Sequence, residues 1–239
     1  MISIVMATYN GAKYIREQLN SIIPYLDNND ELIISDDGST DGTRSIIMCY
    51  VKTDSRIRLI DGPQNNVVKN FENALFEANG DIIMFSDQDD VWLPEKLPRM
   101  RELFAKHPDI NVILHGLFIC SSEQIENGEV GITNRQRRKW RHGVFSNLLF
   151  SAYLGCCIAI RKDFIKQILP FSKHAIAYDQ LVGLVAEHSN SSMFLLEPLI
   201  KHRVHGKNLS HKLPLVDKIK FRIKVWKSYR ETIRKMELL

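Results

Sequence analysis

The chain has 239 residues, of which 44% are hydrophobic and 25% are charged, and its formal net charge is +4. This hydrophobic fraction is sufficient for a sizeable core and excludes a disordered or fibrous chain. The apolar, uncharged run at residues 148–160 is too short to cross a bilayer and contains Gly155, Cys156 and Cys157. We therefore predict one enzyme-sized globular unit without a membrane span, in which this run is buried.

The amino terminus and the cysteines bear on the cellular compartment. The chain starts directly with a strand-like sequence, which leaves no room for a signal peptide. The adjacent pair Cys156 and Cys157 is poorly placed for a disulfide, and with Cys49 and Cys120 it lacks the spacing of a metal site. We expect a cytoplasmic protein with reduced, structural thiols.

The first third of the chain alternates between strand and helix patterns. Residues 3–9 form a β-rich run that ends in a turn, and residues 13–26 carry apolar side chains close to helical period. Residues 31–35 form a second strand-like run. Strand, helix and strand in this order predict a βαβ unit with parallel strands and a right-handed crossover. The carboxyl ends of these strands should therefore meet at one edge of the sheet.

An acidic, glycine-punctuated sequence follows the second strand, over residues 36–43. Asp36 or Asp37 could accept hydrogen bonds from a base N–H or from ribose hydroxyls. Residues Ser39 to Thr43 would cap the next helix and leave its N–H groups pointing outward. An Asp-Gly turn before an ordinary helix explains the same residues, so this pattern alone leaves both interpretations open.

A third apolar run, Ile82 to Phe85, predicts a strand buried on both faces, and it ends in Asp87-Gln88-Asp89-Asp90. Asp87 and Asp89 are two residues apart, so in an extended chain their side chains leave on the same face and could converge on one hard divalent cation. Such a cation takes further ligands from water and phosphate, which favours a phosphate ester as substrate. A solvated acidic turn is the alternative.

Residues 5–10, 35–43 and 87–90, in this order and at these separations, resemble the motifs of family 2 glycosyltransferases with the GT-A fold. The resemblance implies an α/β protein with a Rossmann-like, mostly parallel central sheet flanked by helices, and transfer of a sugar from a nucleoside diphosphate sugar. It makes residues 87–89 the DXD motif, with Asp87 and Asp89 holding Mn²⁺ or Mg²⁺ and Asp89 the direct ligand. The residues it places at the donor are Thr8, Tyr9, Asn10, Asp36, Asp37, Asp87 and Gln88.

Residues 62–75 lie between the second and third motifs. In the family this region opens a helix beside the donor, so the resemblance implies that Lys69 or Asn70 touches ribose or diphosphate. A surface loop followed by an amphipathic helix explains the same residues.

The second half should supply the acceptor side and the base. Residues 151–162 resemble the family's glycine-containing strand before an Arg, which lines the acceptor pocket, and the small residues there should leave room for a sugar. Residues 177–184 stand where the family carries a Glu-Asp pair, but Tyr178 replaces the Glu. An inverting transfer needs a carboxylate that takes the proton from the attacking hydroxyl, and Asp179 is the candidate. An ordinary first-turn helix carboxylate is the alternative.

A cationic cluster follows the apolar run 194–200 and resembles a C-terminal motif of bacterial family members. Dense cationic and imidazole donors suit a diphosphate leaving group, whose developing charge must be neutralised. We assign Arg203 and His205 to the diphosphate, with His205 a further candidate metal ligand. A satisfied structural histidine is the alternative.

The carboxyl-terminal segment carries the excess charge, because residues 217–239 hold eight Lys or Arg against three Asp or Glu. Ile219, Ile223, Trp226 and Ile233 recur at roughly helical spacing. The pattern predicts a basic amphipathic helix that either lies on an anionic leaflet or docks on the catalytic domain with its basic side in water. Residues 135–141 form a second basic run, which we interpret as a mobile acceptor loop. No nucleic-acid recognition motif accompanies either segment.

We predict a catalytic domain over residues 1–210, with a nucleotide and metal half (1–100) and an acceptor half (101–210), followed by a helical tail over 211–239. The predicted function is metal-dependent, inverting glycosyl transfer from a UDP- or dTDP-linked sugar to a saccharide or polyprenyl-linked acceptor in bacterial surface polysaccharide synthesis. Residues 86–92 and 205–208 most resemble rhamnosyltransferases. We expect a cytoplasmic location with peripheral membrane contact through residues 212–239. A phosphatase with a strand-end Asp nucleophile and a non-catalytic nucleotide-sugar-binding module are the alternatives.

Overall fold

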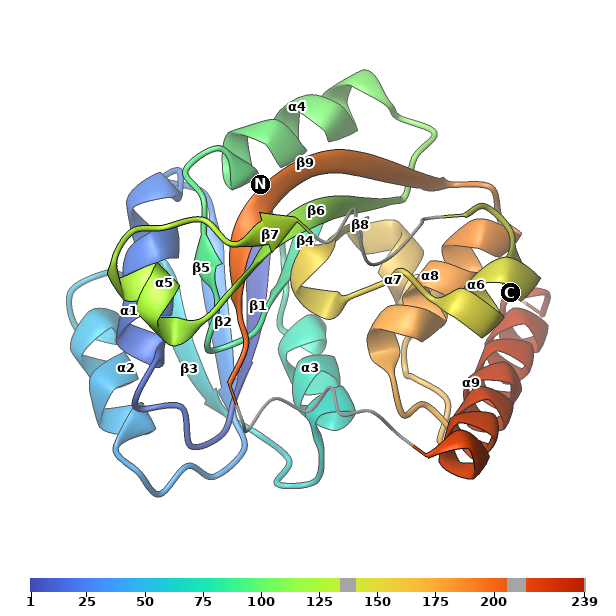
Figure 1. Cartoon of the computed structure of the whole chain (residues 1–239), viewed down its shortest axis with the longest axis horizontal. Coiled ribbons are helices and arrows are strands. Elements are labelled where there is room, and N and C mark those ends of the chain that lie inside the picture. Colours follow the sequence, from blue (N-terminus) through green and yellow to red (C-terminus); the bar gives the residue numbers. More distant parts are fainter. Residues whose placement is uncertain (134–140, 206–213, 239) are drawn as a thin grey trace.

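The computed structural model of the chain describes residues 1–133, 141–205 and 214–238. Within these residues, nine strands form one sheet in the order β3-β2-β1-β4-β8-β6-β9-β5, with β7 paired to β6 at the side (Figure 1). The strands are β1 (Ile2–Thr8), β2 (Glu31–Asp36), β3 (Ile57–Asp61), β4 (Ile82–Ser86), β5 (Val91–Trp92), β6 (Val112–Cys120), β7 (Ile132–Thr133), β8 (Ile158–Arg161) and β9 (Ser192–Arg203). The helices are α1 (Ile15–Ile22), α2 (Thr43–Val51), α3 (Val67–Phe76), α4 (Lys96–Lys106), α5 (Ser122–Glu126), α6 (Val144–Phe150), α7 (Lys162–Ile168), α8 (Tyr178–His188) and α9 (Leu215–Met236), with short 3-10 turns η1 (Ile23–Tyr25) and η3 (Gly155–Cys157).

The four amino-terminal strands of the sheet path are parallel, and for β1, β2 and β4 the βαβ pattern predicts this. β1 pairs with β2 and with β4, and Thr8 lies opposite Asp36 while Met6 lies opposite Ser86. Because the strands run the same way, the loops that follow β1, β2 and β4 leave from one edge of the sheet. The three sequence motifs are therefore brought together.

The second half of the sheet contains both parallel and antiparallel pairs. β8 is antiparallel to both β4 and β6, whereas β9 is parallel to β6. The carboxyl end of β9 therefore reaches the same edge as the end of β4. The short β5, which follows the acidic motif, pairs antiparallel with β9 through Val91 and Lys201. This pairing fixes the end of β9 beside the motif.

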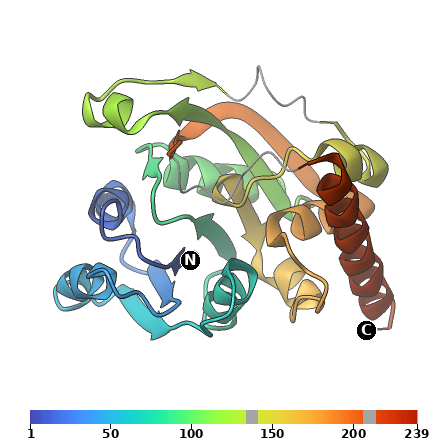
Figure 2. The same ribbon diagram turned by 60° about the horizontal axis from the view of Figure 1, so that its bottom comes forward.

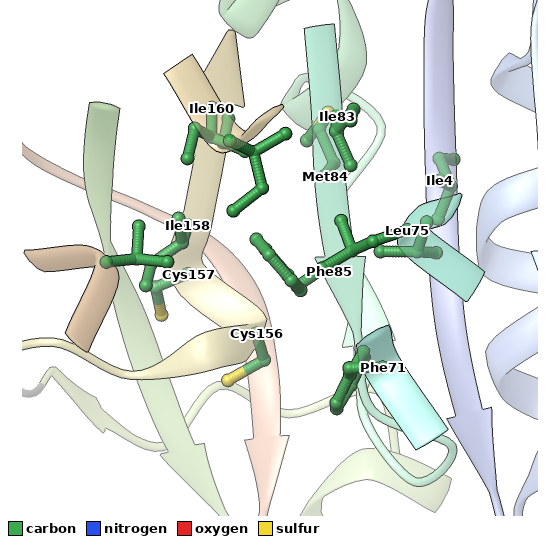
Figure 3. Close-up of a cluster of buried hydrophobic side chains, with 14 of the residues drawn as sticks. Ile4, Phe71, Leu75, Ile83, Met84, Phe85, Cys156, Cys157, Ile158 and Ile160 are labelled. Atoms are coloured by element: carbon green, nitrogen blue, oxygen red, sulfur yellow. The ribbon is translucent and has the colours of Figure 1, made fainter. Parts of the chain in front are cut away.

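The core consists of the sheet strands with the helices packed on them, and Figure 3 shows the part formed by β4, β8 and α3. Phe85 of β4 makes an edge contact with Phe71 of α3, with ring centroids 5.6 Å apart. Ile158 and Ile160 of β8 are fully buried on the far side of β4. Burial of such side chains contributes about 1.5–3 kcal/mol each.

Local structure differs from the sequence prediction at two places. The first helix ends at Ile22, because Pro24 lies in the 3-10 turn η1 and has no N–H to donate. The second helix begins within the predicted cap, where Gly42 has φ +91° and the Asp41 carboxylate accepts from the Thr43 N–H. The run 148–160 is only partly buried, since Leu149 and Phe150 are 60% and 65% exposed.

The long helix α9 lies along one side of the molecule, next to α6 and α8 (Figure 2). Val225 and Tyr229 are buried against the rest of the chain, and the Tyr229 hydroxyl lies 2.8 Å from His188 Nδ1. Among the residues that the structure describes, no helix is long and apolar enough to cross a membrane.

Candidate active site

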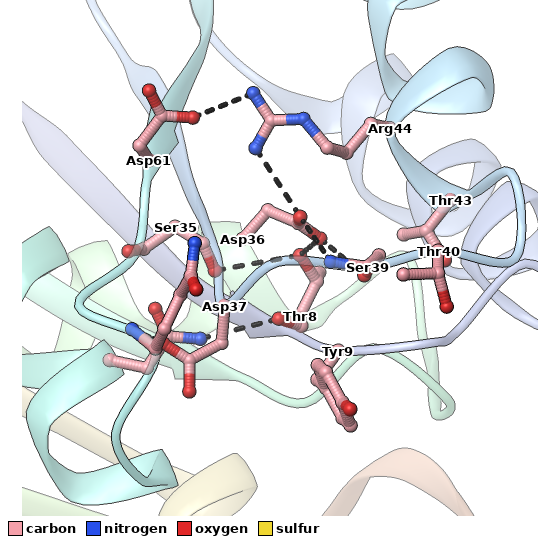
Figure 4. A network of polar contacts seen from close by, with 12 residues as sticks. Thr8, Tyr9, Ser35, Asp36, Asp37, Ser39, Thr40, Thr43, Arg44 and Asp61 are labelled. Atoms are coloured by element: carbon pink, nitrogen blue, oxygen red, sulfur yellow. Dashed lines mark hydrogen bonds and ion pairs between the residues drawn. The ribbon is translucent and has the colours of Figure 1, made fainter.

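Asp36 organises the loop that follows β2 (Figure 4). It is 1% exposed, and its carboxylate accepts hydrogen bonds from Thr8 Oγ1 (2.8 Å) and from the Ser39 N–H (2.9 Å) and hydroxyl (2.6 Å). Arg44 reaches both Asp36 and Asp61. Burial alone would raise the pKa of Asp36, but the hydrogen bonds from Ser39, Thr8 and Arg44 hold it below its ordinary value. Asp36 therefore acts as an anionic hub that shapes the loop.

Asp37, Tyr9 and Asn10 lie at the more exposed rim of the same edge. Asp37 accepts a hydrogen bond from the Gln64 N–H (2.6 Å), and Tyr9 is 59% exposed. Asn10 adopts a left-handed φ of 49°, which this residue type tolerates, and its side-chain oxygen accepts from the Thr40 N–H (2.9 Å). An exposed ring beside a carboxylate and turn N–H groups provides both stacking and hydrogen-bonding partners for a nucleoside.

Gln88 joins the loop after β4 to the loop after β1. Its amide accepts from the Tyr9 N–H (2.9 Å) and donates to the Tyr9 carbonyl (3.0 Å). A Cβ at Gly11 would lie 2.3 Å from the Gln88 oxygen, so this approach requires glycine. The middle residue of the predicted DXD motif thus fixes the spacing between the two loops.

The three carboxylates after β4 repel one another. Burial, together with the neighbouring Asp90 and Asp89 carboxylates, raises the pKa of Asp87 to about 8. Burial and Asp90 also raise the pKa of Asp89, against the lowering effect of its hydrogen bond with His205. A crowded acidic group of this kind fits a divalent cation, which would relieve the repulsion.

Asp90 is held by the end of β9. Its Oδ1 lies 2.8 Å from His202 Nδ1 and accepts from the Arg203 N–H at 3.1 Å. Burial would lower the pKa of His202, but the Asp90 carboxylate raises it to about 12. Among the described residues, one group of potential metal ligands has ligand atoms that all lie within 4.8 Å of one another, and it consists of Asp90, Cys156 and His202. The predicted ligands Asp87, Asp89 and His205 do not form such a compact group. Asp90 and His202 thus form an ion pair beside the Cys156 thiol.

Arg203 and His205 lie against α1. The Arg203 guanidinium donates to the Asp89 carbonyl (3.0 Å) and pairs with Glu17, while His205 Nε2 lies 2.8 Å from Asp89 Oδ2. Both side chains contact the ring of Tyr14, at 4.8 Å for Arg203 and 4.9 Å for His205. His205 is thus placed beside the predicted metal ligand Asp89. Arg203 is 1% exposed and orients the Asp89 backbone.

Asp179 lies in the first turn of α8, and its carboxylate accepts from the Gln180 N–H (2.8 Å). It is close enough to Asp87 to contribute to the raised pKa of that group. Tyr178, which replaces the family's Glu, is a core residue whose ring packs against Phe71 and Phe85 at 4.5 and 5.0 Å. Packing of Tyr178 therefore fixes the start of α8, with Asp179 facing the acidic motif.

The prediction that small residues at 151–162 leave room for a sugar is wrong at Gly155. A Cβ there would lie 1.9 Å from the Tyr178 hydroxyl, so the phenol occupies the space that glycine leaves. Gly155 also belongs to η3 and not to a strand, which begins only at Ile158. Arg161, the last residue of that strand, donates to the carbonyls of Phe104 and Ile110 and is structural.

Lys69 lies on α3, where its ammonium pairs with Glu72 at 2.5 Å. Glu72 in turn accepts from the Phe171 N–H (2.6 Å). Asn70 is 2% exposed and donates to the Thr8 carbonyl at 3.3 Å. Contact of Lys69 with ribose or diphosphate stays a prediction.

Lys96 was not identified from the sequence. It is fully buried, its ammonium lies 3.6 Å from the centre of the Trp92 ring, and it donates to the Cys156 carbonyl at 2.8 Å. Desolvation lowers its pKa to about 8, although Cys157, Cys156, Asp90 and Asp87 act in the opposite direction. The sequence contains one indication of this role, because Lys96 lies in the first turn of helix α4. A cation there is unfavourable for the helix dipole, which indicates that contacts elsewhere in the fold stabilise it.

Two predicted features fall outside the described residues. These are residues 135–140 of the basic run and residues 206–208 of the C-terminal motif.

Comparison with known proteins identifies the family. The sequence profile of glycosyl transferase family 2 matches residues 3–169, which contain all three motifs. The chain belongs to this family. One curated relative is a Nostoc glycosyltransferase of uncharacterised function, which is 26% identical over 87% of this chain. Another is the dTDP-rhamnosyl transferase RfbG of Shigella flexneri, which is 28% identical over 85% of this chain. The matches span 66% and 72% of those two proteins, respectively.

A third relative is the Escherichia coli UDP-Glc:α-D-GlcNAc-diphosphoundecaprenol β-1,3-glucosyltransferase WfgD. It is 32% identical over 45% of the chain and 42% of its own length. The chain therefore covers only part of several of its relatives.

Solved structures share the fold of this family 2 chain. Residues 1–349 of Staphylococcus aureus TarS, bound to UDP-GlcNAc, superpose with a TM-score of 0.68 at 19% identity, covering 98% of this chain and 70% of that one. A Pyrobaculum calidifontis mannosyltransferase, bound to GDP-Man and Mn²⁺, gives 0.63 at 15% identity over 99% of this chain and 73% of its own. These similarities establish the GT-A fold.

Proposed function

We propose that this chain is the catalytic part of a metal-dependent, inverting glycosyltransferase that moves a sugar from a nucleoside diphosphate to a saccharide or lipid-linked acceptor in bacterial surface polysaccharide synthesis. One observation carries the proposal: the acidic motif, Asp179 and His205 lie together at one edge of the sheet. The loops after β1 and β2, which we assign to the nucleoside, leave from the same edge. Relatives that act on sugar nucleotides support it.

In this proposal each part of the edge has its own task. The exposed Tyr9 ring stacks on the base, and Asp37 binds base or ribose donors. Mn²⁺ or Mg²⁺, held by Asp89 with Asp87 and His205, would neutralise the charge that develops on the diphosphate. Asp179 takes the proton from the attacking acceptor hydroxyl, as an inverting displacement requires.

The donor is a UDP- or dTDP-linked sugar. The similarity to RfbG makes dTDP-rhamnose the first deoxyhexose donor to test, and WfgD makes UDP-glucose the first hexose donor. WfgD also supports a polyprenyl-linked acceptor, and with it contact between this chain and the membrane surface. Product formation on GlcNAc-diphosphoundecaprenol with each donor would separate the two assignments.

The first test is the thermal shift of the protein with UDP, dTDP, GDP and CDP, each with and without Mn²⁺. A nucleotide at 100 times its Kd should stabilise the folded state by about 2.7 kcal/mol, or about 5 °C for a chain of this size. Asp89→Asn should lose the Mn²⁺-dependent part of the shift. The matched control is Asp163→Asn, since the Asp163 side chain is 92% exposed and pairs only loosely with Lys166.

The outcomes separate the alternatives. A Mn²⁺-dependent shift with one nucleotide would support the donor site and narrow the donor. No shift with any nucleotide would contradict the proposed site. Release of inorganic phosphate without sugar transfer would favour a phosphatase, and binding without either reaction would favour a non-catalytic module.

A further inference from the structure

Helix α9 has a buried face and a second, exposed apolar face. The buried face carries Val225 and Tyr229, which are 2% and 6% exposed, with Ser228 and Thr232 beside them. This face packs on α6, α7 and α8. It accounts for the attachment of the helix to the domain, mainly through its carboxyl-terminal half.

The exposed face occupies the first half of α9. Leu215, Val216, Ile219 and Ile223 are 74%, 60%, 54% and 49% exposed. At about 100° per residue they fall within one sector, centred roughly 140° around the helix from the buried face. Contacts within the described chain therefore do not explain why these positions are apolar.

Helix α6 extends this face. Phe145, Leu149 and Phe150 are 71%, 60% and 65% exposed. The Phe145 ring lies 5.7 Å from Trp226, which follows Ile223 by three residues and so lies on the same side of α9. Figure 2 shows α6 alongside α9. We call the set the α6/α9 surface; it consists of Phe145, Leu149, Phe150, Leu215, Val216, Ile219 and Ile223.

The charges around this surface indicate its partner. Exposed apolar side chains gathered on neighbouring helices mark an interaction site. Interfaces between proteins are depleted of lysine, whereas helices that lie in the membrane interface carry lysine and arginine beside their apolar face. Lys220 and Lys227 are exposed next to the apolar sector of α9, and the Arg141 guanidinium lies 5.7 Å from the Phe150 ring. This combination matches an anionic lipid surface.

We propose that the α6/α9 surface seats the protein on an anionic lipid bilayer. The apolar side chains enter the boundary between headgroups and acyl chains, and the flanking lysines contact lipid phosphates. Because α9 packs on α8, whose first turn carries Asp179, docking here places the acceptor half of the site near the membrane. Binding to the bilayer would bring the site to the lipid-linked acceptor of the proposed function. Only this consequence rests on the proposed function, because the binding itself needs neither donor nor acceptor.

Co-sedimentation with vesicles tests the proposal without donor or acceptor. Wild-type protein should bind vesicles of phosphatidylcholine with phosphatidylglycerol, and should bind pure phosphatidylcholine vesicles about tenfold more weakly or less. Ile219→Glu/Ile223→Glu, and separately Phe145→Glu, should weaken binding about tenfold or more. Phe76→Glu is the matched control, because Phe76 is 61% exposed on α3, outside this surface, and its replacement should leave binding unchanged.

Two results would overturn the proposal. One is absence of wild-type binding to anionic vesicles. The other is equal binding by wild type and Ile219→Glu/Ile223→Glu. If wild type instead self-associates in light scattering and only this double variant is monomeric, the surface is a contact between copies of the chain. Retention of the nucleotide-induced thermal shift by the double variant shows that the fold and donor site are intact, so failure of docking and failure of the proposed function are distinguished.

Discussion

At the scale of single residues, the candidate site contains side chains that are saturated by partners within the protein and side chains that are more exposed. Asp36 is almost fully buried, and its carboxylate accepts hydrogen bonds from Thr8 and Ser39 and pairs with Arg44. Asp37, its neighbour, is less buried. The two adjacent carboxylates look equivalent in the sequence, but burial and hydrogen bonding give them different roles.

Replacement of Asp179 by Asn tests the proposed base. Asp179→Asn should leave the nucleotide-induced thermal shift intact and lower sugar transfer by about 10²-fold or more, because the amide cannot take the proton of the acceptor hydroxyl. Transfer rates and thermal shifts would be measured on the same preparation, with Asp163→Asn as the surface control. Normal turnover by Asp179→Asn would remove this residue from the mechanism.

Removal of Asp90 should destabilise the fold. In Asp90→Ala the protonated His202 loses its buried partner and the Arg203 N–H loses its acceptor, so the free energy of unfolding should fall by about 3–5 kcal/mol. Asp90→Asn, which keeps the shape and an acceptor oxygen, should cost less. Urea unfolding measures both, and an unchanged midpoint for Asp90→Ala would show that the pair is energetically unimportant.

At the scale of elements, short segments are fixed by contacts with distant ones. η3 is held by Lys96 from the start of α4, and its Gly155 leaves space for Tyr178 from the start of α8. The strand β5 is held by β9. Neither η3 nor β5 has enough internal hydrogen bonding to be stable by itself, so both depend on these partners.

Lys96 should give the stability of the protein a specific pH dependence. Its pKa is about 8 in the folded protein, against an ordinary value near 10.4, so between these values the unfolded state binds more protons. The free energy of unfolding should therefore rise with pH over this range, by up to about 3 kcal/mol from this group. Below pH 8 the cost of burying the charge is fully present.

The measurement compares wild type with Lys96→Met, which keeps the length of the side chain and removes the titration. Chemical unfolding at pH 8 and pH 10 should show a larger increase in stability for wild type than for Lys96→Met. Titratable groups that do not interact with Lys96 contribute equally to both proteins and cancel in the difference. An identical increase in the two proteins would refute the assignment.

At the scale of the whole molecule, β9 completes the site. It runs parallel to β6 and delivers His202, Arg203 and His205 to the edge where β4 ends, more than 110 positions away in sequence from Asp89 and Asp90. α8 carries the proposed base Asp179, and α9 packs on α8 and carries the surface that we assign to the membrane. The donor loops, the carboxylates and the docking surface thus come from segments throughout the chain.

The sequence by itself determined the parallel order of β1, β2 and β4 and the meeting of their three motifs, because βαβ connections have one hand and parallel strands share an edge. It also carried the family resemblance. These features depend on local periodicity and on chain connectivity, which a sequence displays directly.

Only the tertiary structure decided which polar groups are used up by partners and which face a ligand. The pairing of Asp90 with His202, the burial of Lys96 under Trp92, and the filling of the space at Gly155 by Tyr178 all join residues far apart in the chain. Such contacts depend on how the sheet reverses direction and how side chains pack across it. No local pattern encodes them, because spacing along a chain does not specify distance in a folded core.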